Sequence, residues 1–128
     1  MSKLHLRFLC ITDVYRVEQF ALVKSLVEKY SGHGTTKLVL PGDFLGGSQF
    51  SVLSEGESII HILNELHLDY VTLGNHEFDY GCKRTAALMD LSNFPWLGSN
   101  VRDTTTNKIF HNTVDLDYFD VTDNNHCV

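Results

Sequence analysis

The chain has 128 residues with 10 basic and 16 acidic side chains, so its formal net charge is −6 with neutral histidines. This length predicts one domain, and a hydrophobic share of 43% is enough for a core, which excludes a chain disordered throughout. The acidic balance lacks the basic surface that nucleic-acid backbones require, and no apolar run approaches the roughly 18 to 20 residues of a membrane span. We therefore expect no nucleic-acid partner and no membrane insertion.

The N-terminal residues pass directly into strand-like sequence, without the apolar stretch and cleavage site of a secretory leader. This predicts a cytoplasmic protein. The three cysteines, Cys10, Cys82 and Cys127, are widely spaced and form no C-x-x-C pair, so we expect free thiols. Cys10 lies in an apolar run and is expected to be a small core residue.

The first third of the chain alternates between strand and helix patterns. Residues 4–11 first alternate and then run apolar, which predicts a strand entering a buried sheet. From about Arg16 to Tyr30 apolar residues recur every three or four positions, which predicts an amphipathic helix. Residues 37–40 form a second short apolar strand, which Pro41 and Gly42 end.

The same alternation continues to about residue 101. Ser54 and Glu57 have the S-x-x-E spacing of a capping box and predict the start of a second helix. A strand at 70–73, a helix at 81–91 and a strand at 96–98 follow. The order β-α-β-α-β-α-β predicts an α/β fold with a mostly parallel sheet.

The pattern degrades in the last part of the chain. Residues 108–116 are a candidate for one more strand, and residues 120–128 are polar and without periodicity. We therefore divide the chain into a partial domain at 1–101 and an irregular or truncated segment at 102–128.

Polar residues stand directly after three of the predicted strands. Asp13 follows the first, Asp43 the second, and Asn75 and His76 the third, with Asp13, Asp43 and Asn75 separated by 30 and 32 positions. Each separation fits one strand-helix unit, and the carboxyl ends of parallel strands form the edge where open α/β sheets bind ligands. These side chains are therefore expected to converge.

Carboxylate, amide and imidazole groups at one edge predict a site for one or two divalent metals, with Mn, Fe, Zn or Mg as the ions that suit them. An aspartate can bridge two metals. Paired metals supply hydroxide at neutral pH and hold the attacking and leaving oxygens in phosphoryl transfer. No G-x-x-x-x-G-K-[ST] or G-x-G-x-x-G motif offers another way to bind a phosphate.

The pattern resembles the calcineurin-like metallophosphoesterases, and most of all their 5′-nucleotidase branch, over about residues 5–101. The resemblance implies the N-terminal half of that family's α/β sandwich. The segments that carry it are Pro41-Gly42-Asp43-Phe44-Leu45, Gly74-Asn75-His76-Glu77-Phe78-Asp79 and Trp96-Leu97-Gly98-Ser99-Asn100-Val101.

The resemblance also implies roles for individual residues. Asp13 would bind the first metal, Asp43 would bridge the two metals, and Asn75 would bind the second. His76 would face the scissile phosphate, so that His76 and Asp43 are the catalytic candidates. Glu77 and Asp79 would support the loop.

Two features depart from the family's pattern. The first motif of the family is D-x-H, whereas this chain has Tyr15 in the place of the histidine. Tyr15 either binds a ferric ion as a tyrosinate, as in the purple acid phosphatases, or only narrows the site. The second departure is that the family's downstream histidines, including a G-H-x-H motif, do not occur in these 128 residues.

These departures leave two hypotheses for the function. The first is a metal-dependent phosphoesterase that hydrolyses phosphate esters, with nucleotides as one substrate class, of which this sequence is an incomplete part from a short isoform or gene model. The second is a catalytically inactive binding or regulatory module. The expected partners are a small phosphorylated substrate and, through an incomplete sheet, a second copy of the chain.

Overall fold

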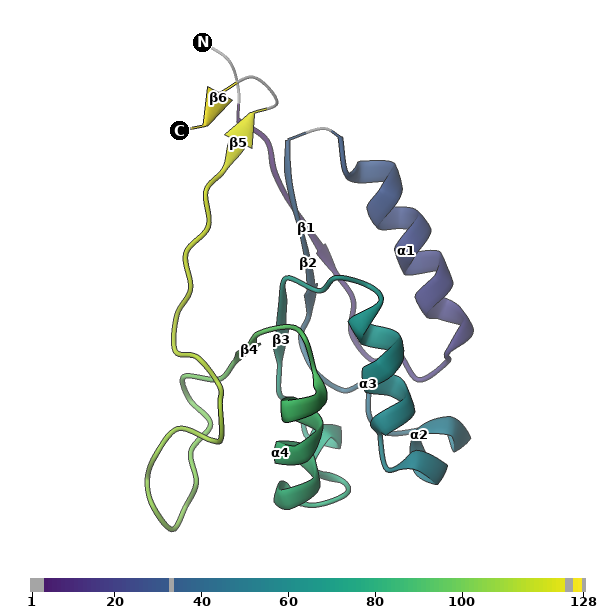
Figure 1. Cartoon of the computed structure of the whole chain (residues 1–128), viewed down its shortest axis with the longest axis vertical. Coiled ribbons are helices and arrows are strands. Elements are labelled where there is room, and N and C mark those ends of the chain that lie inside the picture. The colour runs from purple at the N-terminus through teal and green to yellow at the C-terminus, as the bar shows by residue number, and fades with distance from the viewer. Residues whose placement is uncertain (1–3, 33, 124–125, 128) are drawn as a thin grey trace.

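The computed structural model describes residues 4–32, 34–123 and 126–127 and has a four-stranded parallel sheet at its centre (Figure 1). Parts of the two predicted segments, residues 1–3 and 33 of the first and residues 124–125 and 128 of the second, lie outside the described residues. The strands pair in chain order, which confirms the predicted α/β fold with a parallel sheet. Their bounds are β1 (Leu6–Cys10), β2 (Thr35–Leu40), β3 (Tyr70–Thr72) and β4 (Trp96–Leu97).

Helices connect the strands, as right-handed parallel crossovers require. Two of them were predicted within two residues of their ends. The helices are α1 (Glu18–Tyr30), α2 (Gln49–Ser54), α3 (Glu57–Asn64) and α4 (Cys82–Leu91), with the short 3₁₀ helix η1 (His76–Phe78) before α4.

The predicted capping box at Ser54 is wrong. Ser54 ends α2 instead of beginning α3, and its hydroxyl donates to the carbonyl of Phe50 at 2.8 Å. The residue that precedes α3 is Gly56, whose φ of 86° turns the chain sharply between the two helices. The Ser54 hydroxyl does accept the N–H of Ser58 in the first turn of α3 at 3.2 Å, while Ser48 caps α2 by accepting the N–H of Ser51 at 3.0 Å.

One face of the sheet is buried against the helices. Leu38 and Leu40 of β2, Val71 of β3 and Trp96 of β4 all point to this side and are buried. They pack with the apolar faces of the helices in one continuous core. The other core residues are Val14, Phe20, Val23, Phe44, Leu45, Ile59, Ile60, Leu63, Leu66, Leu68, Leu88, Met89, Phe94 and Phe110.

The opposite face of the sheet is much more open. Leu6, Phe8 and Cys10 are exposed, and Phe8 retains 51% of its accessible surface. The prediction that Cys10 lies in the core is therefore wrong. Alternate residues of β1 point to opposite faces, so Cys10 shares the open face with Phe8 while Leu9 packs against the core.

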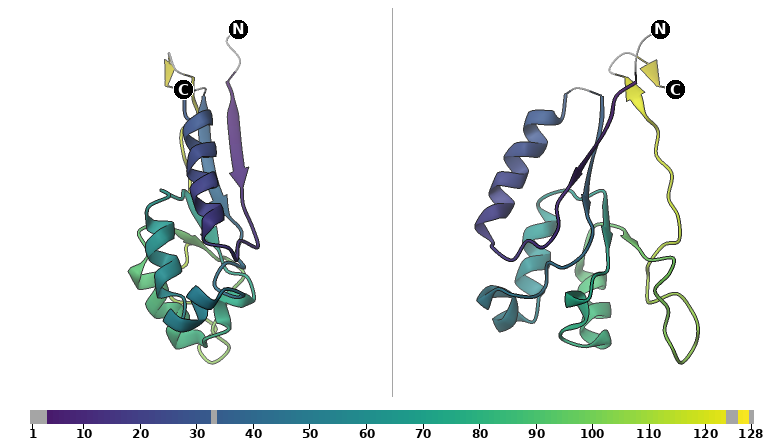
Figure 2. Two further views of the ribbon diagram at one scale, coloured as in Figure 1. Left: turned by 90° about the vertical axis from the view of Figure 1, so that its right-hand side faces the viewer. Right: turned by 180° about the vertical axis from the view of Figure 1, so that it is seen from behind.

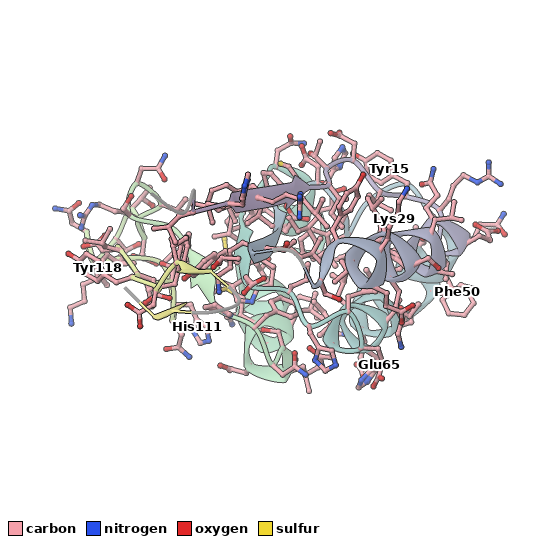
Figure 3. All side chains as sticks on the ribbon, turned by 90° about the horizontal axis from the view of Figure 1, so that it is seen from above. Tyr15, Lys29, Phe50, Glu65, His111 and Tyr118 are labelled. Atoms are coloured by element: carbon pink, nitrogen blue, oxygen red, sulfur yellow. The ribbon has the colours of Figure 1, made fainter. Side chains whose placement is uncertain are left out.

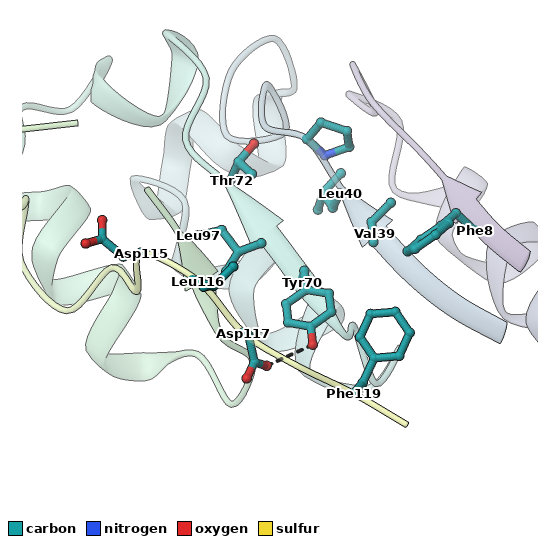
Figure 4. Close-up of a pocket in the computed structure, with 11 residues that line it drawn as sticks. Phe8, Val39, Leu40, Tyr70, Thr72, Leu97, Asp115, Leu116, Asp117 and Phe119 are labelled. Carbon is teal, nitrogen blue, oxygen red and sulfur yellow. Dashed lines mark hydrogen bonds between the residues drawn. The ribbon is translucent and has the colours of Figure 1, made fainter. Parts of the chain in front are cut away.

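The C-terminal segment crosses this open face, on the side of β1 and β2 opposite to α1 (Figures 1 and 2). The Tyr70 hydroxyl donates to Asp117 at 2.8 Å, and the Lys37 ammonium lies 4.8 Å from the centre of the Phe119 ring. Phe119 also meets Phe8 edge-on, with 6.2 Å between the ring centres. Between the segment and the sheet lies an apolar groove of about 420 Å³ (Figure 4).

The predicted strand at 108–116 is also wrong. The structure has two isolated bridges there, Leu97 to Val114 and Arg102 to Ile109. Further on, β5 (Thr122–Asp123) and β6 (His126–Cys127) form a short antiparallel pair. None of the described helices is both long enough and apolar enough to cross a membrane.

Candidate functional site

The sequence-predicted site residues lie in the three loops that leave the carboxyl ends of β1, β2 and β3. Asp13 comes three residues after β1 and Asp43 three residues after β2, whereas Asn75 and His76 follow β3. Asp13 and Asp43 both have positive φ angles, 54° and 56°. Aspartate tolerates this left-handed conformation better than most side chains, so both residues can sit at a sharp change of chain direction.

The loops after β2 and β3 are joined by Glu77, which has no exposed surface. Its Oε2 accepts the N–H groups of Asp43 at 2.8 Å and Gly74 at 2.6 Å. Its Oε1 accepts the N–H groups of Phe44 at 3.0 Å and Leu45 at 3.3 Å. The implied support of the loop by Glu77 is thus present as four hydrogen bonds to two different loops.

The same two loops touch through glycines. A Cβ atom on Gly74 would lie 2.8 Å from the backbone nitrogen of Asp43 and closer still to its carboxylate. A Cβ atom on Gly42, whose φ is +81°, would collide with the backbone nitrogen of Gly74. Glycine is required at both turns because the backbones of the two loops approach too closely to leave room for a side chain.

His76 is held by partners on both sides. Its backbone N–H donates to Asp43 Oδ1 at 3.1 Å, and its ring Nδ1 lies 2.8 Å from Asp79 Oδ2. The hydrogen bond to Asp79 raises the pKa of the His76 imidazole above its ordinary value, although partial burial opposes the shift. A proton on Nδ1 toward Asp79 leaves Nε2 as the ring atom available to a ligand.

Tyr15 connects Asp13 to this arrangement. Its hydroxyl donates to Asp13 Oδ1 at 3.3 Å, and its ring meets the His76 ring edge-on with 5.7 Å between centres. Desolvation and then the charge of Asp13 raise the pKa of the Tyr15 phenol above its ordinary value. The Tyr15 hydroxyl is thus engaged with the Asp13 carboxylate and its ring borders His76.

The carboxylates of Asp13 and Asp43 are hard oxygen donors that suit a divalent cation such as Mg²⁺ or Mn²⁺. Asp43 uses Oδ1 for the N–H of His76. Asn75 is exposed, and among the described residues nothing hydrogen-bonds its side chain. The oxygen atoms of Asp13, Asp43 and Asn75 are therefore of the right chemical type to supply some of the ligands of one hard cation.

A two-metal centre is not assembled by the described part of the chain. No group of three or more His, Cys, Asp or Glu side chains gathers there closely enough to hold a metal ion. The structure brings His76 and Asp43 together and places Tyr15 between Asp13 and His76.

Three further residues contribute to this site without having been predicted to do so. Gly46 and Gly47 leave room for the site's rings, since a Cβ atom would lie 2.8 Å from His76 Nδ1 or 3.0 Å from the Tyr15 ring. Thr85 on α4 is buried and donates to the backbone carbonyl of Glu77 at 2.6 Å. The glycine pair shortly after Asp43 was a visible signal, whereas nothing in the pattern marked Thr85.

A parallel sheet with its polar site in the loops at the carboxyl ends of the strands defines an α/β protein of the ligand-binding type. The family model for "Calcineurin-like phosphoesterase" matches residues 6–125. The chain belongs to the calcineurin-like phosphoesterase family.

Curated relatives are 5′-nucleotidases, in agreement with the resemblance to that branch. A snake venom 5′-nucleotidase from Naja atra is 33% identical over 73 residues, which are 56% of this chain and 14% of the relative. The NAD 5′-nucleotidase of Haemophilus influenzae is 32% identical over 83 residues, which are 64% of this chain and again 14% of the relative. The chain therefore spans about one seventh of the length of these relatives.

A solved structure supports the fold. The crystal structure of a calcineurin-like phosphoesterase from Bacillus subtilis superimposes with a TM-score of 0.67 at 24% sequence identity. The match covers 81% of this chain and 39% of the other. At this identity the likeness shows the fold alone.

Proposed function

We propose that this chain carries part of the site of a metal-dependent phosphoesterase, in which His76 and Asp43 act on a phosphate ester. The observation that supports this most is the arrangement of His76. Its N–H is bound to Asp43 and its ring to Asp79, so both the backbone and the side chain of His76 are oriented at the carboxyl edge of the sheet. Such fixed orientation is what catalysis by proton transfer requires.

Asp13 and Asp43 would hold a divalent cation, with Asn75 as a further oxygen donor. When bound, the cation supplies Lewis-acid activation of water and of the phosphate oxygens. His76 Nε2 would face the phosphate, since Nδ1 is engaged by Asp79. In its protonated form, Nε2–H donates to a phosphate oxygen or to the leaving-group oxygen, and Asp79 stabilises the charge on the ring.

Nucleotides are the substrate class that the relatives support, since the curated relatives are named as 5′-nucleotidases. The loops at the carboxyl edge carry the phosphate chemistry in this proposal.

The test is phosphate release from p-nitrophenyl phosphate and AMP by the purified chain, with Mg²⁺, Mn²⁺, Zn²⁺ or EDTA. We expect a metal-dependent turnover that Asp43→Asn lowers by more than about 100-fold, beyond the 10- to 100-fold loss typical of residues behind metal ligands. The matched control is Asp69→Asn, a carboxylate that binds Lys37 and the N–H of Leu38 away from the site. Full activity in Asp43→Asn would reject the assignment.

The second candidate is a non-catalytic module that binds a cation or phosphate without turnover. Two observations favour it. Among the described residues, no three His, Cys, Asp or Glu side chains lie close enough together to hold a metal ion. The Tyr15 hydroxyl also hydrogen-bonds the Asp13 carboxylate, which is one of the proposed metal ligands. Binding of Mn²⁺ with turnover no higher than that of a buffer blank would select this candidate.

A further inference from the structure

Glu77 is a carboxylate with no exposed surface and no cationic side chain bound to it among the described residues. Each of its oxygens accepts two backbone N–H groups, at distances from 2.6 to 3.3 Å. Burying a charged group is unfavourable unless hydrogen bonds compensate it. Here the compensation comes entirely from the main chain.

The four donors belong to two separate loops. Three successive N–H groups, those of Asp43, Phe44 and Leu45, converge on the carboxylate from the loop after β2. The fourth, that of Gly74, comes from the turn after β3. Successive amides that point at one centre form an anion-binding concavity, and in this protein the anion is a side chain of the neighbouring loop.

Glu77, which lies in η1 after β3, is also anchored to α4. The Thr85 hydroxyl on α4 donates to its backbone carbonyl at 2.6 Å. Glu77 therefore links the Asp43 loop to α4 and to the turn that carries His76. Because the His76 N–H also binds Asp43, any displacement of the loop after β2 changes both contacts.

We propose that Glu77 is a positioning residue, whose two carboxylate oxygens hold Asp43 and the turn of Asn75 and His76 at a fixed separation. The role in catalysis rests on the proposed function, but the positioning itself does not. Glu77 touches no substrate in this proposal and acts through Asp43.

The four backbone N–H donors require that both terminal atoms of the side chain at position 77 are hydrogen-bond acceptors. A glutamine has the same shape, but one of its two terminal atoms is an NH₂ group. In either orientation of the amide, that group faces two backbone N–H donors and leaves them without an acceptor inside the protein. Glu77→Gln thus removes the interaction while nearly preserving the volume.

The experiment is amide hydrogen exchange followed by NMR on the full chain in EDTA. In the wild-type chain, the amides of Asp43, Phe44, Leu45 and Gly74 are expected to exchange at least about tenfold more slowly than the amide of exposed Asn100, although none lies within a helix or strand. In Glu77→Gln we expect these four amides to shift and to lose that protection.

The matched control is Asp69→Asn, which also replaces a carboxylate that accepts a backbone N–H by its amide. A merely structural loss of stability would affect both variants alike. We expect the four amides to keep their chemical shifts and protection in Asp69→Asn. Equal changes in the two variants would overturn the proposal.

If Glu77→Gln does not fold, the wild-type exchange rates decide the question alone. Four amides that exchange as fast as that of Asn100 would overturn the proposal, whereas protection of all four supports it. Binding of Mn²⁺, followed by electron paramagnetic resonance, separates the proposal from the proposed function. Affinity about 10- to 100-fold weaker in Glu77→Gln is expected, while a wild-type chain that binds no Mn²⁺ would reject the function and leave the amide result to decide the positioning.

Discussion

The loop after β1 and the loops after β2 and β3 are fixed in different ways. The loops of Asp43 and His76 are joined through a fully buried carboxylate and through glycines in direct backbone contact. The loop of Asp13 is anchored to the core by Val14, but the hydrogen bonds to the Asp13 carboxylate are exposed, from the Thr12 hydroxyl at 2.8 Å and from the Tyr15 hydroxyl at 3.3 Å. Buried hydrogen bonds to a charge are stronger than exposed ones, because water competes for the exposed groups.

This difference indicates that the chain preorganises one half of its site and not the other. Asp43 and His76 keep their relative positions through buried hydrogen bonds to Glu77 and through the His76 N–H, whereas the hydrogen bonds that orient the Asp13 carboxylate are exposed to water. Three substitutions test this difference between the loops, and we give them from the largest expected effect on stability to the smallest.

The largest effect is expected for Gly74→Ala. The added Cβ atom would lie 2.8 Å from the Asp43 backbone nitrogen, so the two loops must move apart. Overpacking of this kind costs about 1–3 kcal/mol, and urea denaturation measures it as a lower midpoint. Gly32→Ala is the control, because a Cβ atom there meets nothing within 4 Å and surface changes stay within about 0.5 kcal/mol. Equal losses in the two variants would contradict the close contact of the loops.

An intermediate, pH-dependent effect is expected for Asp79→Asn. Asp79 raises the pKa of His76, so the protonated ring is favoured in the folded state. The resulting stabilisation is present below the unfolded pKa of about 6.5 and is lost as the pH rises through the higher folded pKa. Melting curves should therefore separate wild type from Asp79→Asn at low pH and converge at high pH.

NMR titration of the His76 ring in EDTA tests the cause of this effect directly. The pKa of His76 should fall in Asp79→Asn, while the ring signals of His61 on α3 serve as an internal control. An unchanged pKa of His76 would show that Asp79 does not hold the ring in solution.

The smallest effect is expected for Tyr15→Phe. The substitution removes the hydroxyl that donates to Asp13 and keeps the ring that packs on His76. We expect the melting temperature to change by less than about 2 °C, as for other surface substitutions, with amide shifts confined to the loop after β1. A loss of stability as large as that of Gly74→Ala would mean that the Asp13 loop is as firmly held as the other two.

The order of strands and helices and the edge at which the site lies were predictable, because both follow from apolar periodicity and from parallel topology. The exposure of Cys10 was not, since an apolar run does not reveal whether both faces of a strand are covered. Helix α2 was missed because Phe50, Val52 and Leu53 are apolar yet exposed, so they give no amphipathic pattern. Figure 3 shows the Phe50 side chain at the edge of the molecule. Glu77 was visible only through resemblance, because its partners are backbone amides, which leave no mark in a sequence.

The contact between Gly42 and Gly74 also has a consequence for directed evolution. Each glycine leaves no room for a side chain on the other loop, and the two positions are 32 residues apart. A library randomised at both codons and selected for stable protein should be enriched in the glycine pair, because a side chain at either position collides with the other loop. Loop grafting onto this scaffold would therefore succeed only if both turns are transferred as one unit.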